Sequence, residues 1–182
     1  MSPAGTVEGD ERLRLFLGLR LPGTVLDPLE RWQDAHLSGR VVNRANLHIT
    51  LAFLGSRPAS DVPGIASALA EAARGTGRME LSARRYRETR SVGMVVLEDG
   101  TGEGARLAKR VFDGLERLAV YEREKRPWLP HVTVLRFRSA PKLEPPVPDL
   151  GTFEPSDAAV YMSSLRPSGA QYDVLEHVAL GG

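Results

Sequence analysis

Two apolar segments, far apart in the chain, carry the same His-x-Thr pattern. The first is NLHITLAFLG, with His48 and Thr50, and the second is PHVTVLR, with His131 and Thr133. Each segment is short, apolar and rich in β-branched residues, which is typical of a buried strand. Two buried strands with one histidine and one threonine at the same spacing indicate one site built twice.

Side chains alternate between the two faces of a strand, so His48 and Thr50 share one face, and His131 and Thr133 share one face. The apolar residues between and beside them point to the opposite face and belong to the core. If the two strands lie side by side, both imidazoles and both hydroxyls converge on one place. The predicted core-facing residues are Leu47, Ile49, Leu51 and Phe53 in the first segment, and Val132 and Val134 in the second.

The rest of the chain alternates helical and strand patterns in a mixed order. Short connections between successive strands favour antiparallel pairing, and therefore an α+β fold. We expect residues 1–182 to form one domain, with residues 1–11 frayed. Predicted helices cover Pro22–Leu37, Asp61–Arg74 and Gly104–Leu118. Predicted strands cover Arg12–Arg20, a short piece at Val41–Val42, Asn46–Leu54 (ended by Gly55), Met79–Tyr86, Ser91–Leu97, His131–Phe137, Leu150–Phe153, Ala158–Leu165 and Tyr172–Leu180, with a proline-rich surface loop over Ser139–Pro148.

Composition narrows the classes of protein that the chain can belong to. It has 182 residues, 42% of them hydrophobic, which is enough for a sizeable core. It contains no cysteine, which excludes disulfides, thiolate metal ligands and cysteine nucleophiles. No apolar run approaches the roughly 20 residues that span a bilayer. We therefore expect a cytoplasmic protein that does not enter membranes. The net charge of +1 does not by itself indicate a nucleic-acid binder.

A pair of histidines beside two hydroxyls suits acid-base chemistry on a phosphodiester. The ordinary pKa of histidine, about 6.5, allows one imidazole to take a proton while the other gives one. Threonine hydroxyls can donate hydrogen bonds to phosphate oxygens. A 2',3'-cyclic phosphate fits this arrangement, since its strained ring needs only an activated water and a protonated leaving oxygen. Such a site requires no metal ion and no cofactor.

These motifs and their flanks resemble the two-histidine phosphoesterase superfamily, and most closely its RNA 2',3'-cyclic phosphodiesterase branch, the 2'-5' RNA ligase-like or LigT-like proteins. The hallmark of the family is a pair of HxTx motifs, here HITL from His48 and HVTV from His131. The similarity extends to RLFLGL near the start, to RPWLP before the second motif and to SLRP with YDVL near the end. It covers roughly residues 12 to 180.

The resemblance implies a bilobal fold of two antiparallel sheets with flanking helices, related by a pseudo-twofold axis, with the active site in the groove between the lobes. It implies that His48 protonates the leaving 3' oxygen and that His131 activates water. Thr50 and Thr133 would hold the phosphate, with Arg136 as a further phosphate ligand. It also implies a monomer without cofactor or metal that acts on RNA ends or small cyclic nucleotides.

The chain departs from the family pattern at three places. The second motif ends in Val134-Leu135-Arg136, where the family more often has Leu-Ala-Arg. The segments around Arg84–Arg87 and Ser91–Met94 lack the residues common there, and both border the groove in the family. Strict alternation also places Arg136 on the face opposite His131, so it reaches the site only through a bulge or twist of the strand.

Other functions remain open from the sequence. The same two histidines would serve an RNA 2'-5' ligase or a 2'-5' oligonucleotide phosphodiesterase. A non-catalytic RNA-binding protein could keep the same scaffold, and a plain α+β interaction domain could use its histidines structurally. The chain also offers an arginine cluster for RNA or for a solvated strand edge (Arg84, Arg85, Arg87, Arg90), two aromatic residues for base stacking or packing (Trp128, Tyr86), two histidines expected to be structural or exposed (His36, His177) and a glycine-rich turn (Gly100–Gly104).

Overall fold

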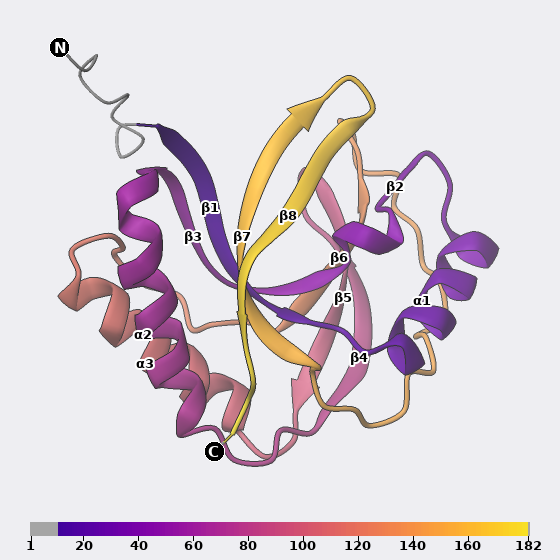
Figure 1. Cartoon of the computed structure of the whole chain (residues 1–182). Coiled ribbons are helices and arrows are strands. Elements are labelled where there is room, and N and C mark those ends of the chain that lie inside the picture. The colour runs from indigo at the N-terminus through magenta and orange to yellow at the C-terminus, as the bar shows by residue number, and fades with distance from the viewer. Residues whose placement is uncertain (1–10, 182) are drawn as a thin grey trace, which may run out of the picture.

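The computed structural model describes residues 11–181, so nearly all of the segment predicted to fray, residues 1–11, lies outside the described residues. Figure 1 shows three helices around a strongly curled sheet. The helices are α1 (Gly23–His36), α2 (Val62–Arg74) and α3 (Glu103–Arg117). The strands are β1 (Arg12–Arg20), β2 (Arg40–Val41), β3 (His48–Pro58), β4 (Leu81–Glu88), β5 (Val92–Asp99), β6 (His131–Arg136), β7 (Asp157–Arg166) and β8 (Gly169–Val178), with single turns of 3-10 helix at Arg44–Asn46 and Ala59–Asp61.

The strands follow the order β4-β5-β6-β3-β1-β7-β8, with β2 paired to β6, and every neighbouring pair is antiparallel. This confirms the α+β class. The strands form one continuous sheet instead of the two separate sheets that were expected. Its two halves, β4-β5-β6 and β3-β1-β7-β8, join through one registered pair, Ile49 with Val132. In Figure 1, α1 lies beside the first half, and α2 and α3 lie together beside the second.

The helices match the apolar periodicity of the sequence. Each places a stripe of buried side chains against the sheet, and the stripes of all three helices meet in one core. Leu118, the last residue of the third predicted helix, is 44% exposed because α3 ends at Arg117. The buried stripes are Val25, Leu29 and Trp32 in α1, Ile65, Leu69 and Ala72 in α2, and Leu107, Val111 and Leu115 in α3.

One predicted strand does not form. Leu150–Phe153 contributes only an isolated bridge, in which Phe153 pairs with Leu81. The segment directly before it contains Pro145, Pro146 and Pro148, and proline lacks the N–H that a ladder requires. The proline-rich loop, by contrast, is confirmed, and a tight turn at Gly169 joins β7 to β8.

The first motif strand continues past Gly55 to Pro58, against the prediction. Gly55 has a φ of 70°, and the pairing of β3 with β1 shifts twice, once at Leu51 and once at Leu54. A bulge adds one residue to a strand and reverses the alternation beyond it. Phe53, predicted to lie in the core, therefore faces the other side of the sheet and is 69% exposed.

The two faces of the sheet carry different residues. The core face packs against the helices. The opposite face, called the site face below, carries His48, Thr50, His131 and Thr133. A small buried cluster of Phe16, Ala159 and Tyr161 lies apart from the main core, with Tyr172 packed on it. Within the part of the chain that the structure describes, no helix has the length and apolar character that a membrane crossing needs.

Candidate active site

The pairing of β3 with β6 brings the two motifs together from positions far apart in the sequence. Ile49 pairs with Val132 in antiparallel register, and both are fully buried. One step along the strands, His48 lies opposite Thr133 and Thr50 opposite His131. Directly opposite residues share a face, so the four side chains form one group in which the motifs are related by an approximate twofold. The predicted parity of both motifs is confirmed.

Both ring nitrogens of His48 are engaged. Nδ1 lies 2.7 Å from the carbonyl oxygen of Asn46, and because a carbonyl can only accept, Nδ1 carries the proton. Nε2 lies 2.9 Å from Oγ1 of Thr50 and accepts the hydroxyl proton when the imidazole is neutral. The ring of Phe16 lies 4.9 Å away, centroid to centroid, and the rings of Tyr161 and Tyr172 lie 5.5 Å away. These three aromatic rings pack against the imidazole of His48.

His131 repeats the local geometry of His48. Its Nδ1 lies 2.8 Å from the carbonyl oxygen of Leu129, two residues earlier, as the Nδ1 of His48 does with Asn46. The carbonyl fixes the proton on Nδ1 and leaves the lone pair on Nε2. In both motifs the backbone carbonyl thus selects the same tautomer of the imidazole.

The two imidazoles differ in their surroundings. Burial lowers the pKa of His48 to about 4, since the charged form loses its hydration, and the positive charges of His131 and Arg136 act in the same direction. The hydrogen bond to the Asn46 carbonyl opposes this shift. His48 is therefore neutral at neutral pH in the free protein, with Nε2 accepting from the hydroxyl of Thr50.

Arg136 reaches the site face through a bulge in β6. Thr133 pairs with Met94 but Leu135 pairs with Gly93, so Val134 is the extra residue. The alternation reverses there, and Arg136 joins the face of His131 and Thr133, which the sequence alone allowed only with such a bulge. The guanidinium donates to the hydroxyl of Tyr172 across 3.2 Å.

Gln33 of α1 holds this bulge. Its side chain is buried, and its amide donates to the carbonyl oxygens of Val42 and Val134, at 3.1 Å each. The carbonyl of Val134 also accepts from the backbone N–H of Val42, across 3.0 Å. A buried polar side chain is stable only when it is paired, and here its partners are the bulge and the adjoining segment. Nothing in the sequence around Gln33 signals this role.

A second arginine, which the sequence analysis did not single out, lies beside Arg136. Arg40 of β2 pairs directly with Arg136 in antiparallel register, and both side chains are exposed. Like charges directly opposite each other destabilise a sheet, and an anion between them removes that cost. The site face therefore offers two guanidinium groups beside the histidine-threonine group.

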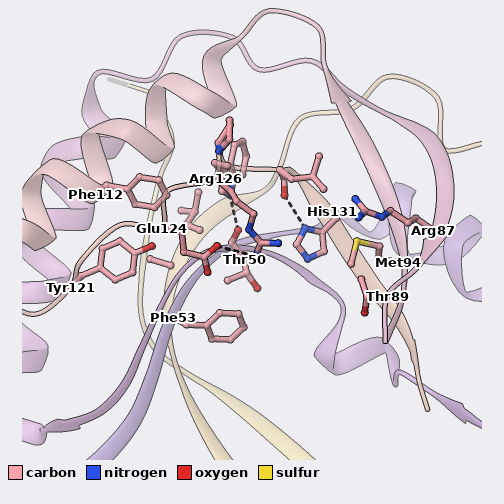
Figure 2. Close-up of a pocket in the computed structure, with 15 residues that line it drawn as sticks. Thr50, Phe53, Arg87, Thr89, Met94, Phe112, Tyr121, Glu124, Arg126 and His131 are labelled. Atoms are coloured by element: carbon pink, nitrogen blue, oxygen red, sulfur yellow. Dashed lines mark hydrogen bonds and ion pairs between the residues drawn. The ribbon is translucent and has the colours of Figure 1, made fainter. Parts of the chain in front are cut away.

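A cavity of about 680 Å³ opens next to the motifs, as Figure 2 shows. Thr50 and His131 line it, whereas His48, Thr133 and Arg136 lie outside its walls. The cavity extends away from the histidines towards α3. Its other labelled walls are the aromatic side chains of Phe53, Phe112 and Tyr121, the charged side chains of Arg87, Glu124 and Arg126, and the side chains of Thr89 and Met94.

Phe53 is the wall residue that the sequence analysis misplaced. Only Gly55, a residue that tolerates the positive φ of a bulge, marks the irregularity in the sequence. Trp128 packs against the core, one of the two roles that the sequence left open, and its Nε1 donates to the carbonyl oxygen of Thr50 across 3.0 Å. It therefore fixes the loop before β6 to the first motif strand while it lines the cavity.

The remaining candidates lie outside the site. Tyr86 packs against the core and donates to Glu88 across 2.8 Å, so it is a packing residue. His177 lies 3.3 Å from Asp157, and His36 is exposed at the end of α1, as expected for both. The glycine-rich stretch turns into α3 through Gly102, with a φ of 76°. Within residues 11–181, no three His, Asp or Glu side chains gather closely enough to hold a metal ion.

The fold and the paired motifs define a phosphoesterase of the two-histidine class. A profile of the 2'-5' RNA ligase superfamily matches residues 21–160. The RNA 2',3'-cyclic phosphodiesterase of Escherichia coli (strain K12) is 29% identical over 175 residues, which are 93% of this chain and 98% of that protein. The RNA 2',3'-cyclic phosphodiesterase of Thermus thermophilus is 31% identical over 181 residues, which are 93% of this chain and 91% of that protein.

Solved structures agree with the sequence comparisons. The crystal structure of E. coli LigT in complex with 3'-AMP superposes with a TM-score of 0.79 at 26% identity, and the match covers 93% of this chain and 99% of that one. The chain belongs to the 2'-5' RNA ligase superfamily.

Proposed function

We propose that this protein is an RNA 2',3'-cyclic phosphodiesterase, which hydrolyses 2',3'-cyclic phosphate ends to 2'-phosphates. The observation that carries the proposal is the shared geometry of His48 and His131. In each, a backbone carbonyl two residues earlier holds Nδ1–H, and Nε2 is left for proton transfer on the same face of the sheet. The names of the two curated relatives support the same activity.

In the proposed reaction, Nε2 of His131 takes a proton from water, and the water oxygen bonds to phosphorus. The bond between phosphorus and the 3' oxygen breaks, and His48 gives that oxygen a proton. The phosphate stays on the 2' oxygen. Thr50 and Thr133 donate to the non-bridging oxygens, and Arg136 stabilises the negative charge of the phosphate.

The low pKa of His48 sets a condition on this assignment of roles. His48 is neutral in the free protein, so as the acid it gains its proton only when the negative phosphate binds and raises the pKa. The hydroxyl of Thr50, which now donates to Nε2, would turn to a phosphate oxygen at the same time. The opposite assignment uses His48 as the base, a role that its neutral form suits, and the pH dependence of the two alanine variants distinguishes the assignments.

The cavity supports a nucleoside as the bound group. Its walls include Phe53, Tyr121 and Trp128, and aromatic side chains bind bases by stacking in a sequence-tolerant way. LigT has been crystallised with 3'-AMP, a nucleoside that carries one phosphate. We further propose that the chain acts as a monomeric, two-lobed domain over residues 1–182, in the cytoplasm, during RNA processing.

The test is hydrolysis of a short RNA that ends in a 2',3'-cyclic phosphate, with EDTA present. His48→Ala and His131→Ala are compared with wild type and with His36→Ala, a matched control outside the site. We expect a 2'-phosphate product from wild type and the control, and a loss of about 10²- to 10⁴-fold in kcat for each site variant. Circular dichroism and thermal unfolding check that each variant folds.

Three outcomes would change the proposal. Activity within tenfold of wild type in a folded His48→Ala or His131→Ala variant would remove the acid-base roles. If wild type turns over neither this RNA nor 2'-5' linked oligonucleotides, in either the hydrolytic or the ligating direction, the chain is better described as an RNA-binding protein on a phosphoesterase scaffold. Turnover of 2'-5' linked RNA alone would favour the ligase or oligonucleotide phosphodiesterase alternative.

A further inference from the structure

The outer strand β4 places two arginines on the site face. In the register of β4, β5 and β6, Arg85 pairs with Val96, and Val96 pairs with His131. In the same way, Arg87 pairs with Met94, and Met94 pairs with Thr133. Directly paired residues share a face, so two rows run from the catalytic strand to two arginines.

The alternating partners on β4 confirm this assignment of faces. Tyr86 lies between the two arginines, pairs with Val95 and packs against the core. The bulge at Arg84 lies before both positions, so it does not disturb the alternation from Arg85 to Arg87. Figure 2 shows the side chain of Arg87 at the edge of the cavity, next to Met94 and His131.

Both arginines are exposed, and no ion pair involves either of them within the described part of the chain. The acidic residue next to Arg87, Glu88, is already engaged. Its carboxylate accepts hydrogen bonds from the hydroxyl of Tyr86 and from the backbone N–H groups of Lys142 and Leu143. Both guanidinium groups are therefore free of a carboxylate partner within the described residues and can contact a ligand.

We propose that Arg85 and Arg87 bind backbone phosphates of the RNA strand that leads to the cyclic end, so that the protein prefers an oligonucleotide to a mononucleotide. This inference rests on the proposed function and names its substrate class. Neighbouring strands are about 4.8 Å apart, which places the two arginines about 10 Å from the His131 strand. Their long side chains then meet the chain of nucleotides next to the reacting one, while the reacting phosphate stays between the histidines.

Edge strands also carry charge to prevent pairing with other sheets. That role requires charged residues anywhere along the edge strand, and it does not require them to lie near the active site. The observed arrangement is more specific, because Arg87 is a wall of the cavity that Thr50 and His131 also line. An electrostatic grip on phosphates predicts a dependence on salt that a guard against aggregation does not.

The experiment measures binding and turnover with the double variant Arg85→Gln/Arg87→Gln. The matched control is Arg74→Gln/Arg117→Gln, which removes two exposed charges from the ends of α2 and α3. Fluorescence anisotropy follows a labelled short RNA that ends in a 2'-phosphate, a product that requires no turnover to bind. Salt titration gives the slope of log affinity against log salt concentration for each protein.

We expect the double variant to bind the RNA about tenfold or more weakly at low salt. Because each single-strand phosphate contact contributes about 0.7 to the salt slope, its slope becomes shallower by about 1.4. The control keeps the wild-type slope. The ratio of kcat/KM for RNA over a nucleoside 2',3'-cyclic phosphate falls about tenfold in the double variant and not in the control.

An unchanged slope in the double variant, or an equal change in the control, overturns the proposal, as does a wild-type protein that prefers the mononucleotide. The failure of the proposed function has a different signature. If wild type hydrolyses no cyclic phosphate but the salt slopes differ as expected, the arginine surface stands and the catalytic proposal falls.

Discussion

The space beside Gly18 of β1 is filled by the backbone of β3 and by the ring of His48, so a larger residue does not fit there. A Cβ built on Gly18 would lie 2.9 Å from the carbonyl oxygen of Ile49, 3.2 Å from Cδ2 of His48 and 3.3 Å from Cε2 of Tyr161. The first contact is shorter than real Cβ atoms show, and its partner is backbone. Gly18→Ala therefore moves β3 or displaces the imidazole.

The size of the effect follows from these contacts. Inserting one methyl group into a packed site costs about 1–3 kcal/mol in the free energy of unfolding. The imidazole is held at both nitrogens, by Asn46 at 2.7 Å and Thr50 at 2.9 Å, so a shift of a few tenths of an ångström disturbs both hydrogen bonds. Misplacement by about 1 Å can cost about 10²-fold in rate, so we expect a loss of about tenfold in kcat.

Urea unfolding and steady-state kinetics measure these two quantities. Gly23→Ala is the matched control, since the nearest atom to its added Cβ is 4.0 Å away, on the flexible side chain of Arg44. We expect the control to keep both stability and kcat. A Gly18→Ala protein with wild-type kcat and wild-type stability would refute the packing argument, and a loss of stability alone would show that β3 yields while His48 stays in place.

Three further predictions concern other parts of the site. The lowered pKa of His48 means that the folded protein binds this proton less tightly than the unfolded chain, so stability is lost as pH falls from about 6.5 to about 4. Wild type should lose up to about 3 kcal/mol more unfolding free energy over that range than His48→Gln, and parallel pH curves would contradict this. Gln33→Leu removes the side-chain donor from the carbonyls of Val42 and Val134, so that Val134 keeps only the N–H of Val42, and it frees the bulge before Arg136. It should cost about 2–4 kcal/mol in unfolding free energy and raise KM, whereas the exposed Gln171→Leu should do neither; an unchanged KM would separate the bulge from substrate binding. Phe53→Ser should change stability by less than about 0.5 kcal/mol, because the ring is 69% exposed. It should nevertheless weaken nucleotide binding by about 1–3 kcal/mol, the contribution of stacking one base on an aromatic ring. The control is Leu165→Ser, at the tip of a hairpin, and equal nucleotide binding by the two variants would exclude Phe53 from the site.

Local patterns in the sequence were sufficient for much of the fold. The helices begin and end within two residues of their predicted bounds, since apolar periodicity, Pro22 and Gly75 mark them. The alternation around His48 and His131 also placed both motifs on the correct face. The family followed from the motifs and their flanks, and the comparisons confirm it. The roles of the individual site residues remain predictions.

Features that depend on strand pairing were not visible in the sequence. Phe53 was placed in the core, and strict alternation left Arg136 on the face opposite His131 unless a bulge intervened, because alternation assumes that no residue is extra. The bulges at Leu51, Leu54 and Val134 reverse that alternation. Each exists because a neighbouring strand, distant in sequence, pairs on both sides of the extra residue.

The sequence by itself determined the two strands with their histidines and threonines, the helices and the membership of the superfamily, because these depend on local periodicity and on short motifs. The tertiary structure decided which side chains surround the reaction. Gln33 binds the carbonyl of Val134, a residue 101 positions away, and so turns Arg136 towards the histidines. A buried carbonyl must find a partner, and only the folded chain determines which donor is within reach.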